Sequence, residues 1–151
     1  MVALLLLLIA IYVRVGIGRS RVPAAETWLV RIPFSLYLGW ITVATIANVT
    51  EVLYYLNWSG WGISPEIWAV IMLVAGAIIA SLVSLSRGDI AYVLVIVWAF
   101  AGIAVKQSST PPVAISAAAL AAVVLLTLLA GVPLTRRRLG RQETAAPRDR
   151  W

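Results

Sequence analysis

The chain has 151 residues, of which 62% are hydrophobic, and its mean hydropathy is +0.98. Soluble domains of this length are usually just under half apolar, so the composition predicts an integral membrane protein. The sequence contains no cysteine and no histidine, which excludes disulfides, zinc sites and histidine-ligated haem within this chain.

The hydropathy pattern predicts an all-α fold, a polytopic membrane helix bundle of about five transmembrane helices. The predicted spans lie near residues 1–17, 28–55, 65–86, 90–106 and 111–134, so that residues 1–135 form the bundle. The first span reaches Arg14 after about 13 apolar residues, short of the roughly 20 that cross a bilayer. We interpret it as a helix whose upstream context is missing; a short reverse signal anchor is the alternative.

The second span, residues 28–55, carries more polar side chains than the others. Ser35, Thr42 and Thr45 interrupt its apolar run. Buried polar groups are costly in a membrane unless they find partners, so this span should face other helices or a cavity. At helical steps of three or four residues, one stripe contains Pro33, Tyr37, Trp40, Ala44, Asn48 and Glu51.

The third and fourth spans have clear start signals. Ser64 is the predicted N-cap of the third span and Asp89 that of the fourth. Within the third span, Gly76, Ala80 and Ser84 recur at every fourth position. Such a ridge of small residues allows another helix to approach closely, although chance in an alanine-rich span would explain it too.

Basic residues separate to one side of the predicted bundle. With alternating spans, the first and third loops and the tail hold eleven of the 12 basic residues, and only Lys106 falls on the other side. The positive-inside rule then predicts an external N-terminus and a cytoplasmic C-terminus in the inner (cytoplasmic) membrane. This distribution explains the net charge of +6 without nucleic-acid binding. The basic tail, residues 136–151, should be disordered and lie on anionic lipid.

The stretch IPFSLYLGWITVATIANV resembles the last helix of the TspO/MBR family, the tryptophan-rich sensory proteins. The matching positions are Pro33, Phe34, Trp40, Ala44 and Asn48. The wider match runs from the first residue to about Gln107 and is similar to the C-terminal portion of the long bacterial members. The family's early tryptophan- and proline-rich motifs are absent from this chain.

The resemblance implies a helix bundle that binds porphyrins or sterol-like aromatic molecules. It assigns the pocket border to Trp40 and Ala44, and lining or hydrogen-bonding roles to Tyr37 and Asn48. Phe34 takes the place of the aromatic residue after proline. The sequence alone also allows Trp40 merely to pack between helices.

The predicted function is the binding of a flat hydrophobic ligand, such as a porphyrin, in a sensing or transport role. No catalytic constellation is visible, so no enzyme, no metal and no resident cofactor are predicted. The alternatives are a structural membrane module or truncated fragment without a ligand, and a small transporter with an ion site at Glu51 and Lys106. Membrane lipids are the expected partners, and the sequence leaves a homodimer open.

Overall fold

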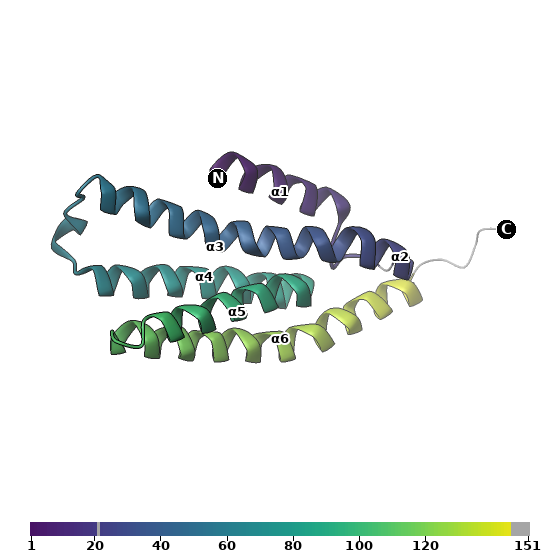
Figure 1. Cartoon of the computed structure of the whole chain (residues 1–151). Coiled ribbons are helices and arrows are strands. Elements are labelled where there is room, and N and C mark those ends of the chain that lie inside the picture. The colour runs from purple at the N-terminus through teal and green to yellow at the C-terminus, as the bar shows by residue number, and fades with distance from the viewer. Residues whose placement is uncertain (21, 146–151) are drawn as a thin grey trace.

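The computed structural model describes residues 1–20 and 22–145, and this part of the chain contains helices and no strands. Five long helices lie side by side (Figure 1): α1 (Val2–Val15), α3 (Ile32–Tyr55), α4 (Pro65–Arg87), α5 (Ile90–Lys106) and α6 (Pro111–Ala145). A short α2 (Ala24–Glu26) and a π-helical turn, η1 (Thr27–Arg31), precede α3, and a 3₁₀ turn, η2 (Gly60–Gly62), lies between α3 and α4. The helix α3 packs against α1 and α5, α4 and α5 both pack against α6, and α3 meets α4 in few places.

Three stretches are long and apolar enough to cross a membrane: Ala24–Leu53, Pro65–Arg87 and Pro111–Thr135. The apolar helices α1 and α5 are shorter, with 14 and 17 residues. At ~1.5 Å per residue they extend about 21 and 26 Å, against roughly 30 Å of bilayer hydrocarbon. The predicted all-α membrane bundle is confirmed, and each predicted span corresponds to one helix.

The start of α3 shows how Pro33 is accommodated inside an apolar helix. A proline has no N–H and its ring crowds the carbonyl four residues earlier. The turn immediately before it is π-helical, and the backbone N–H of Ile32 donates to the carbonyl of Thr27, five residues back. The wider turn gives the ring room.

The same turn places Arg31 inside the protein, where its side chain is only 8% exposed. Its Nη1 donates to the backbone oxygen of Ser20 at 2.7 Å, and its Nη2 to the Ser20 hydroxyl at 2.9 Å. Its Nε pairs with Glu26 at 3.3 Å. These bonds fix the loop after α1 to the base of α3.

The predicted N-caps are confirmed. Ser64 accepts a hydrogen bond from the N–H of Ile67 at 3.5 Å at the start of α4, and Asp89 accepts one from the N–H of Tyr92 at 3.2 Å at the start of α5.

The small-residue ridge of α4 is buried along its whole length, and Ala80 and Ser84 are completely inaccessible. At one end the Ser84 hydroxyl donates to the backbone oxygen of Thr127 in α6 at 2.9 Å. A Cβ on Gly131 of α6 would lie 2.5 Å from the Ser84 carbonyl oxygen. At the other end a Cβ on Gly76 would lie 3.3 Å from the ring of Phe100 in α5. The ridge therefore serves helix packing, as predicted.

The last predicted span, residues 111–134, coincides with the apolar stretch Pro111–Thr135, but the disorder expected for the residues that follow it is wrong. The helix α6 continues through Pro133 as far as Ala145, so residues 136–145 are helical rather than disordered. Alanine, leucine, arginine, glutamine and glutamate all favour helix, and lengthening an existing helix avoids the cost of nucleation. Figure 1 shows α6 curving along its C-terminal half, where Pro133 removes a backbone hydrogen bond. Residues 146–151 of the predicted tail lie outside the described residues.

Candidate ligand-binding cavity

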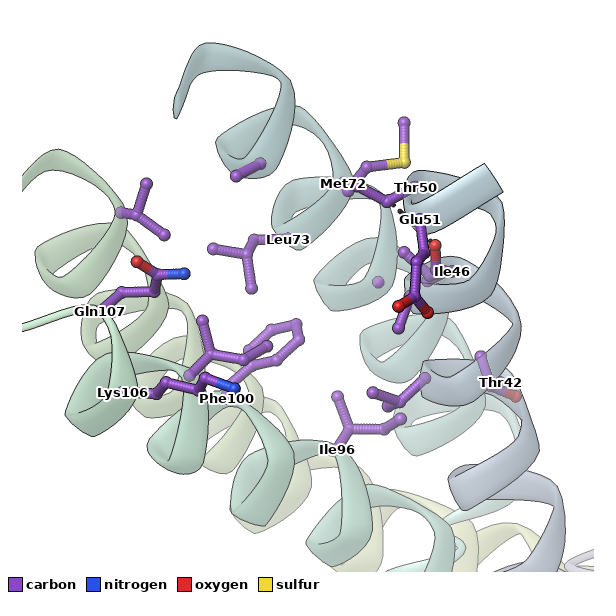
Figure 2. A pocket seen from close by; sticks show the side chains of 16 residues that line it. Thr42, Ile46, Thr50, Glu51, Met72, Leu73, Ile96, Phe100, Lys106 and Gln107 are labelled. Carbon is purple, nitrogen blue, oxygen red and sulfur yellow. Dashed lines mark hydrogen bonds between the residues drawn. The ribbon is translucent and has the colours of Figure 1, made fainter. Parts of the chain in front are cut away.

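A cavity of about 580 Å³ lies between α3, α4 and α5. It exists because α3 and α4 both contact α5 but meet each other in few places. Figure 2 shows the 16 side chains that line it, which project from these three helices and, for Val113, from the start of α6.

The floor of the cavity is apolar. Ile96 and Phe100 of α5 are 1% and 4% exposed, and Leu73 of α4 is also buried. Gly76 completes the floor beside Phe100, since a Cβ at this position would lie only 3.3 Å from the edge of the ring. A flat apolar molecule could rest on this surface with its face against Phe100.

The rim of the cavity is polar. Thr50 and Glu51 contribute from the last turns of α3, and Lys106 and Gln107 from the end of α5. Glu51 and Lys106 project into the same space from different helices (Figure 2), and neither forms an ion pair with another residue of the described chain. The rim lies at the end of the bundle that carries the α3–α4 and α5–α6 loops, and it offers both a carboxylate and an ammonium group to a ligand.

The polar side chains inside α3 have partners, as membrane burial requires. Thr42 and Thr45 donate to the carbonyls four residues earlier, at 2.8 and 2.7 Å. Thr42, at the deep end of the cavity, also accepts a bond from the Tyr92 hydroxyl at 3.4 Å. Ser35 instead donates to Asp89 at 2.6 Å.

A second polar centre lies at the opposite end of the bundle, around the carboxylate of Asp89, which is 8% exposed. The hydroxyls of Tyr12 and Ser35 donate to its Oδ2 at 2.8 and 2.6 Å, while Oδ1 caps α5. One carboxylate thus joins α1 and α3 to the first turn of α5. Its hydrogen-bond donors among the described residues are all neutral groups of the protein, which marks it as a structural anchor.

The residues that the sequence singled out for ligand binding lie on another face of α3. Tyr37 and Trp40 are 46% and 50% exposed, Asn48 is exposed, and Ala44 is half-buried. Phe34 is half-buried and packs against the hydrophobic core. None of the five lines the cavity. Their assignment to a ligand stays a prediction.

One of the predicted aromatic residues, Trp40, does meet another tryptophan. The rings of Trp40 and Trp98 lie 5.7 Å apart on the outer side of the α3–α5 contact. With Leu36, Leu94 and Val95 they line a shallow groove of about 490 Å³. Asn48 does not line this groove, and its Nδ2 donates to the carbonyl of Ala44 in its own helix at 3.0 Å.

Sequence reasoning missed the residues of the cavity floor. Phe100 could have been noticed, because it is one of only two phenylalanines and lies within a predicted span. Gly76 could have been noticed as a member of the small-residue ridge. Glu51 and Lys106 drew attention as candidates for an ion site. The structure places both at the rim of the same cavity.

Comparison with known proteins agrees with this architecture. The sequence model of a family described as TSPO-like protein matches residues 1–130, which include α1, α3, α4, α5 and more than half of α6. The chain matches no curated protein and no solved structure. Because the family match extends over most of the chain, this multi-pass helical membrane protein belongs to the TSPO-like protein family.

Proposed function

We propose that this protein binds a flat hydrophobic ligand with an acidic edge, such as a porphyrin, in the cavity between α3, α4 and α5. The observation that carries the proposal is the cavity itself, with an apolar floor and a charged rim. Its volume of about 580 Å³ falls among those of small-molecule sites, roughly 300–1,000 Å³. Membership of the TSPO-like family supports the same ligand class through the resemblance described above.

The cavity would hold the two parts of such a ligand differently. The ring system would cover the apolar floor, where stacking on Phe100 contributes about 0.5–1.5 kcal/mol beyond the burial of apolar surface. The carboxylates would lie at the rim beside Lys106, while Glu51 would repel a second negative charge placed near it. A neutral sterol-like ligand would use the floor alone.

Ligand binding would also change the contact between helices. The helices α3 and α4 meet in few places, and a bound ring would contact both. A ligand that prefers the arrangement with these helices bridged shifts the protein towards that arrangement. This coupling is the physical basis for the sensing role that we propose. For a transport role, the ligand would have to leave the cavity by another route.

A second candidate site is the outer groove at Trp40, favoured by the tryptophan pair with its rings 5.7 Å apart. It would use the residues that the family resemblance indicates, with Tyr37 and Ala44 beside Trp40. This groove is shallow and exposed, so a ligand there would remain in contact with lipid.

A matched pair of variants separates the two sites. Ala47 lines the cavity and Ala44 does not, although the two alanines lie one turn apart on α3. Ala47→Phe should fill the cavity and weaken quenching of tryptophan fluorescence by protoporphyrin at least tenfold, while Ala44→Phe leaves it unchanged. The reverse result would place the ligand at Trp40. Absence of quenching in the wild type would favour a structural membrane module.

We also propose that the chain resides in the cytoplasmic membrane with its N-terminus outside. The excess of basic residues in the loops at the Arg87 end and in the tail supports this orientation. The rim of the cavity would then face the external side, and ligands would enter from there or from the outer leaflet.

A further inference from the structure

Two rows of exposed apolar side chains border the outer groove between α3 and α5. Leu36 and Trp40 follow one another at a spacing of four residues on α3, and Ile90, Leu94 and Trp98 do so on α5. All five are between 44% and 65% exposed. The same spacing on both helices makes the rows run along the helix axes.

The floor of the groove is formed by a close contact of the two helices. A Cβ on Gly39 would lie 3.1 Å from the carbonyl oxygen of Tyr92 and 3.1 Å from the Cβ of Val95. Val95 itself lines the groove. The backbones can approach because Gly39 has no side chain, and the larger residues on either side rise above the contact as walls.

At the Asp89 end, the groove continues into a recess of about 700 Å³ whose lining combines apolar side chains with a few polar ones. Leu36 and Leu94 line both the groove and the recess, so the two are continuous. The polar residues that line the recess include Arg31, Arg87, Ser20 and the buried Asp89. One continuous depression therefore has a purely apolar part and a part that holds two guanidinium groups.

The charges in the recess leave Arg87 available. Glu26 pairs with Arg31 at 3.3 Å, and the Asp89 carboxylate is occupied by hydroxyl and backbone donors of the protein. The guanidinium of Arg87 forms no ion pair with a described residue and donates one hydrogen bond, to the carbonyl of Ile17 at 3.0 Å. The guanidinium carbon of Arg87 also lies over the ring of Tyr12, 4.8 Å from the ring centroid, which further fixes the side chain. An arginine has five N–H donors, so most of those on Arg87 can serve an anion.

The length of the depression matches one lipid leaflet. Nine residues separate Arg31 from Trp40, which at ~1.5 Å per residue is about 14 Å, close to half of the roughly 30 Å hydrocarbon layer. Tryptophan in membrane proteins is usually enriched at the two interfaces. The Trp40–Trp98 pair instead lies at mid-depth, where the acyl chain of a lipid anchored at Arg87 would end.

We propose that this depression binds one anionic phospholipid of the leaflet on the Arg87 side. Its phosphate contacts Arg87, with Arg31 and Ser20 beside it, and one acyl chain lies in the groove and ends at Trp40 and Trp98. The site is separate from the α3–α4–α5 cavity, since none of the residues that line the groove also lines that cavity. Lipid binding here holds α3 and α5 together from outside.

The tryptophan pair provides the readout. The wild-type protein is placed in nanodiscs of phosphatidylcholine with a minor fraction of phosphatidylglycerol brominated near the chain end, and quenching of tryptophan fluorescence is measured. Bromine at this depth quenches tryptophans at mid-membrane. Brominated phosphatidylglycerol should bind roughly fivefold more strongly than equally brominated phosphatidylcholine, as measured by the lipid fraction that gives half-maximal quenching. This is the difference expected for one basic contact. The preference should fall in a Trp98→Phe variant that removes one reporter.

Three variants test the basic contact. Arg87→Gln should abolish the preference for phosphatidylglycerol and Arg87→Lys should keep most of it. Arg19→Gln should leave it intact, because Arg19 is next to Ser20 in the chain but does not line the recess. An equal loss in Arg19→Gln would mean general attraction to a charged surface and would overturn the site.

Two further results test the lipid site even if the Arg87→Gln variant does not fold. Equal quenching of the wild type by the two brominated lipids would show only an ordinary lipid shell and would overturn the proposal. Excess inorganic phosphate should leave the quenching unchanged. Displacement of the brominated lipid by phosphate would identify the recess as a site for a free anion and contradict the docking of a lipid.

Discussion

Replacing Gly131 of α6 by alanine tests the close contact of α4 and α6. The new Cβ would lie 2.5 Å from the carbonyl oxygen of Ser84, whereas ordinary contacts begin near 3.4 Å. The two helices must therefore separate by about 0.9 Å, the difference between these distances. The hydrogen bond from the Ser84 hydroxyl to Thr127, now 2.9 Å, would lengthen to about 3.8 Å and be lost.

The expected cost follows from three terms. Overpacking a tight contact costs roughly 1–3 kcal/mol, and a hydrogen bond between membrane helices contributes ~0.6 kcal/mol. Exchanging glycine for alanine inside a helix stabilises the helix by up to about 1 kcal/mol. We expect Gly131→Ala to lower the free energy of unfolding by about 2 kcal/mol.

The assay is unfolding in mixed micelles by titration with sodium dodecyl sulfate, followed by far-ultraviolet circular dichroism. Gly102→Ala is the matched control, because a Cβ on Gly102 of α5 meets nothing within 4 Å. That variant should be as stable as the wild type or slightly more stable. If Gly131→Ala unfolded at the same detergent fraction as Gly102→Ala, the described α4–α6 contact would be wrong.

Three other predictions concern topology, ligand charge and the polar anchor. A reporter fused after Trp151 should read cytoplasmic and one inserted at Gly60 external; the opposite readout at either position would contradict the orientation. Lys106→Gln should weaken binding of protoporphyrin by about two- to fivefold, the usual effect of one exposed ionic contact, and leave its dimethyl ester unaffected; an equal loss for both would remove Lys106 from the site. Asp89→Asn should destabilise the protein by ~1–3 kcal/mol in detergent unfolding, and more than Ser35→Ala, because the carboxylate joins three helices; equal effects would reduce its role to a single hydrogen bond.

The helices and their starts were predictable because their signals are local. Long apolar runs mark the spans. Ser64 and Asp89 are recognisable as N-caps because serine and aspartate favour that position and each comes just before an apolar run. The end of α6 was misplaced for a related reason. The change from apolar to basic residues after Thr135 marks the edge of the membrane, but helix formation does not require an apolar sequence.

The inward face of α3 could not be derived from its sequence. Lipid tails are as apolar as a helix interface, so a membrane helix shows little contrast between its buried and exposed faces. Polar residues occur on two faces of α3: Ser35 and Thr45 point inward, whereas Asn48 is exposed and bonds to its own backbone. The stripe through Trp40 was therefore as good a candidate as the one that the fold buries.

The cavity could not be predicted from any single segment, because it depends on how several helices are arranged. It arises from the divergence of α3 and α4 over α5, and its lining residues come from four helices. Gly76 lies in the middle of α4 and Phe100 in the second half of α5, so only the fold brings them together.

The π-helical turn at Thr27–Arg31 has a consequence for tolerated changes in chain length. A π turn contains one residue more than the α-helical turn that would replace it. Deleting one residue from this turn would leave Ser35, Leu38 and Thr42 facing the same neighbours, but it would also bring the ring of Pro33 against the carbonyl four residues earlier. One residue deleted further along α3 would instead rotate every later side chain by about 100°. Versions of this protein that lack one residue of this turn should therefore also have another residue in place of Pro33, because the two changes compensate each other.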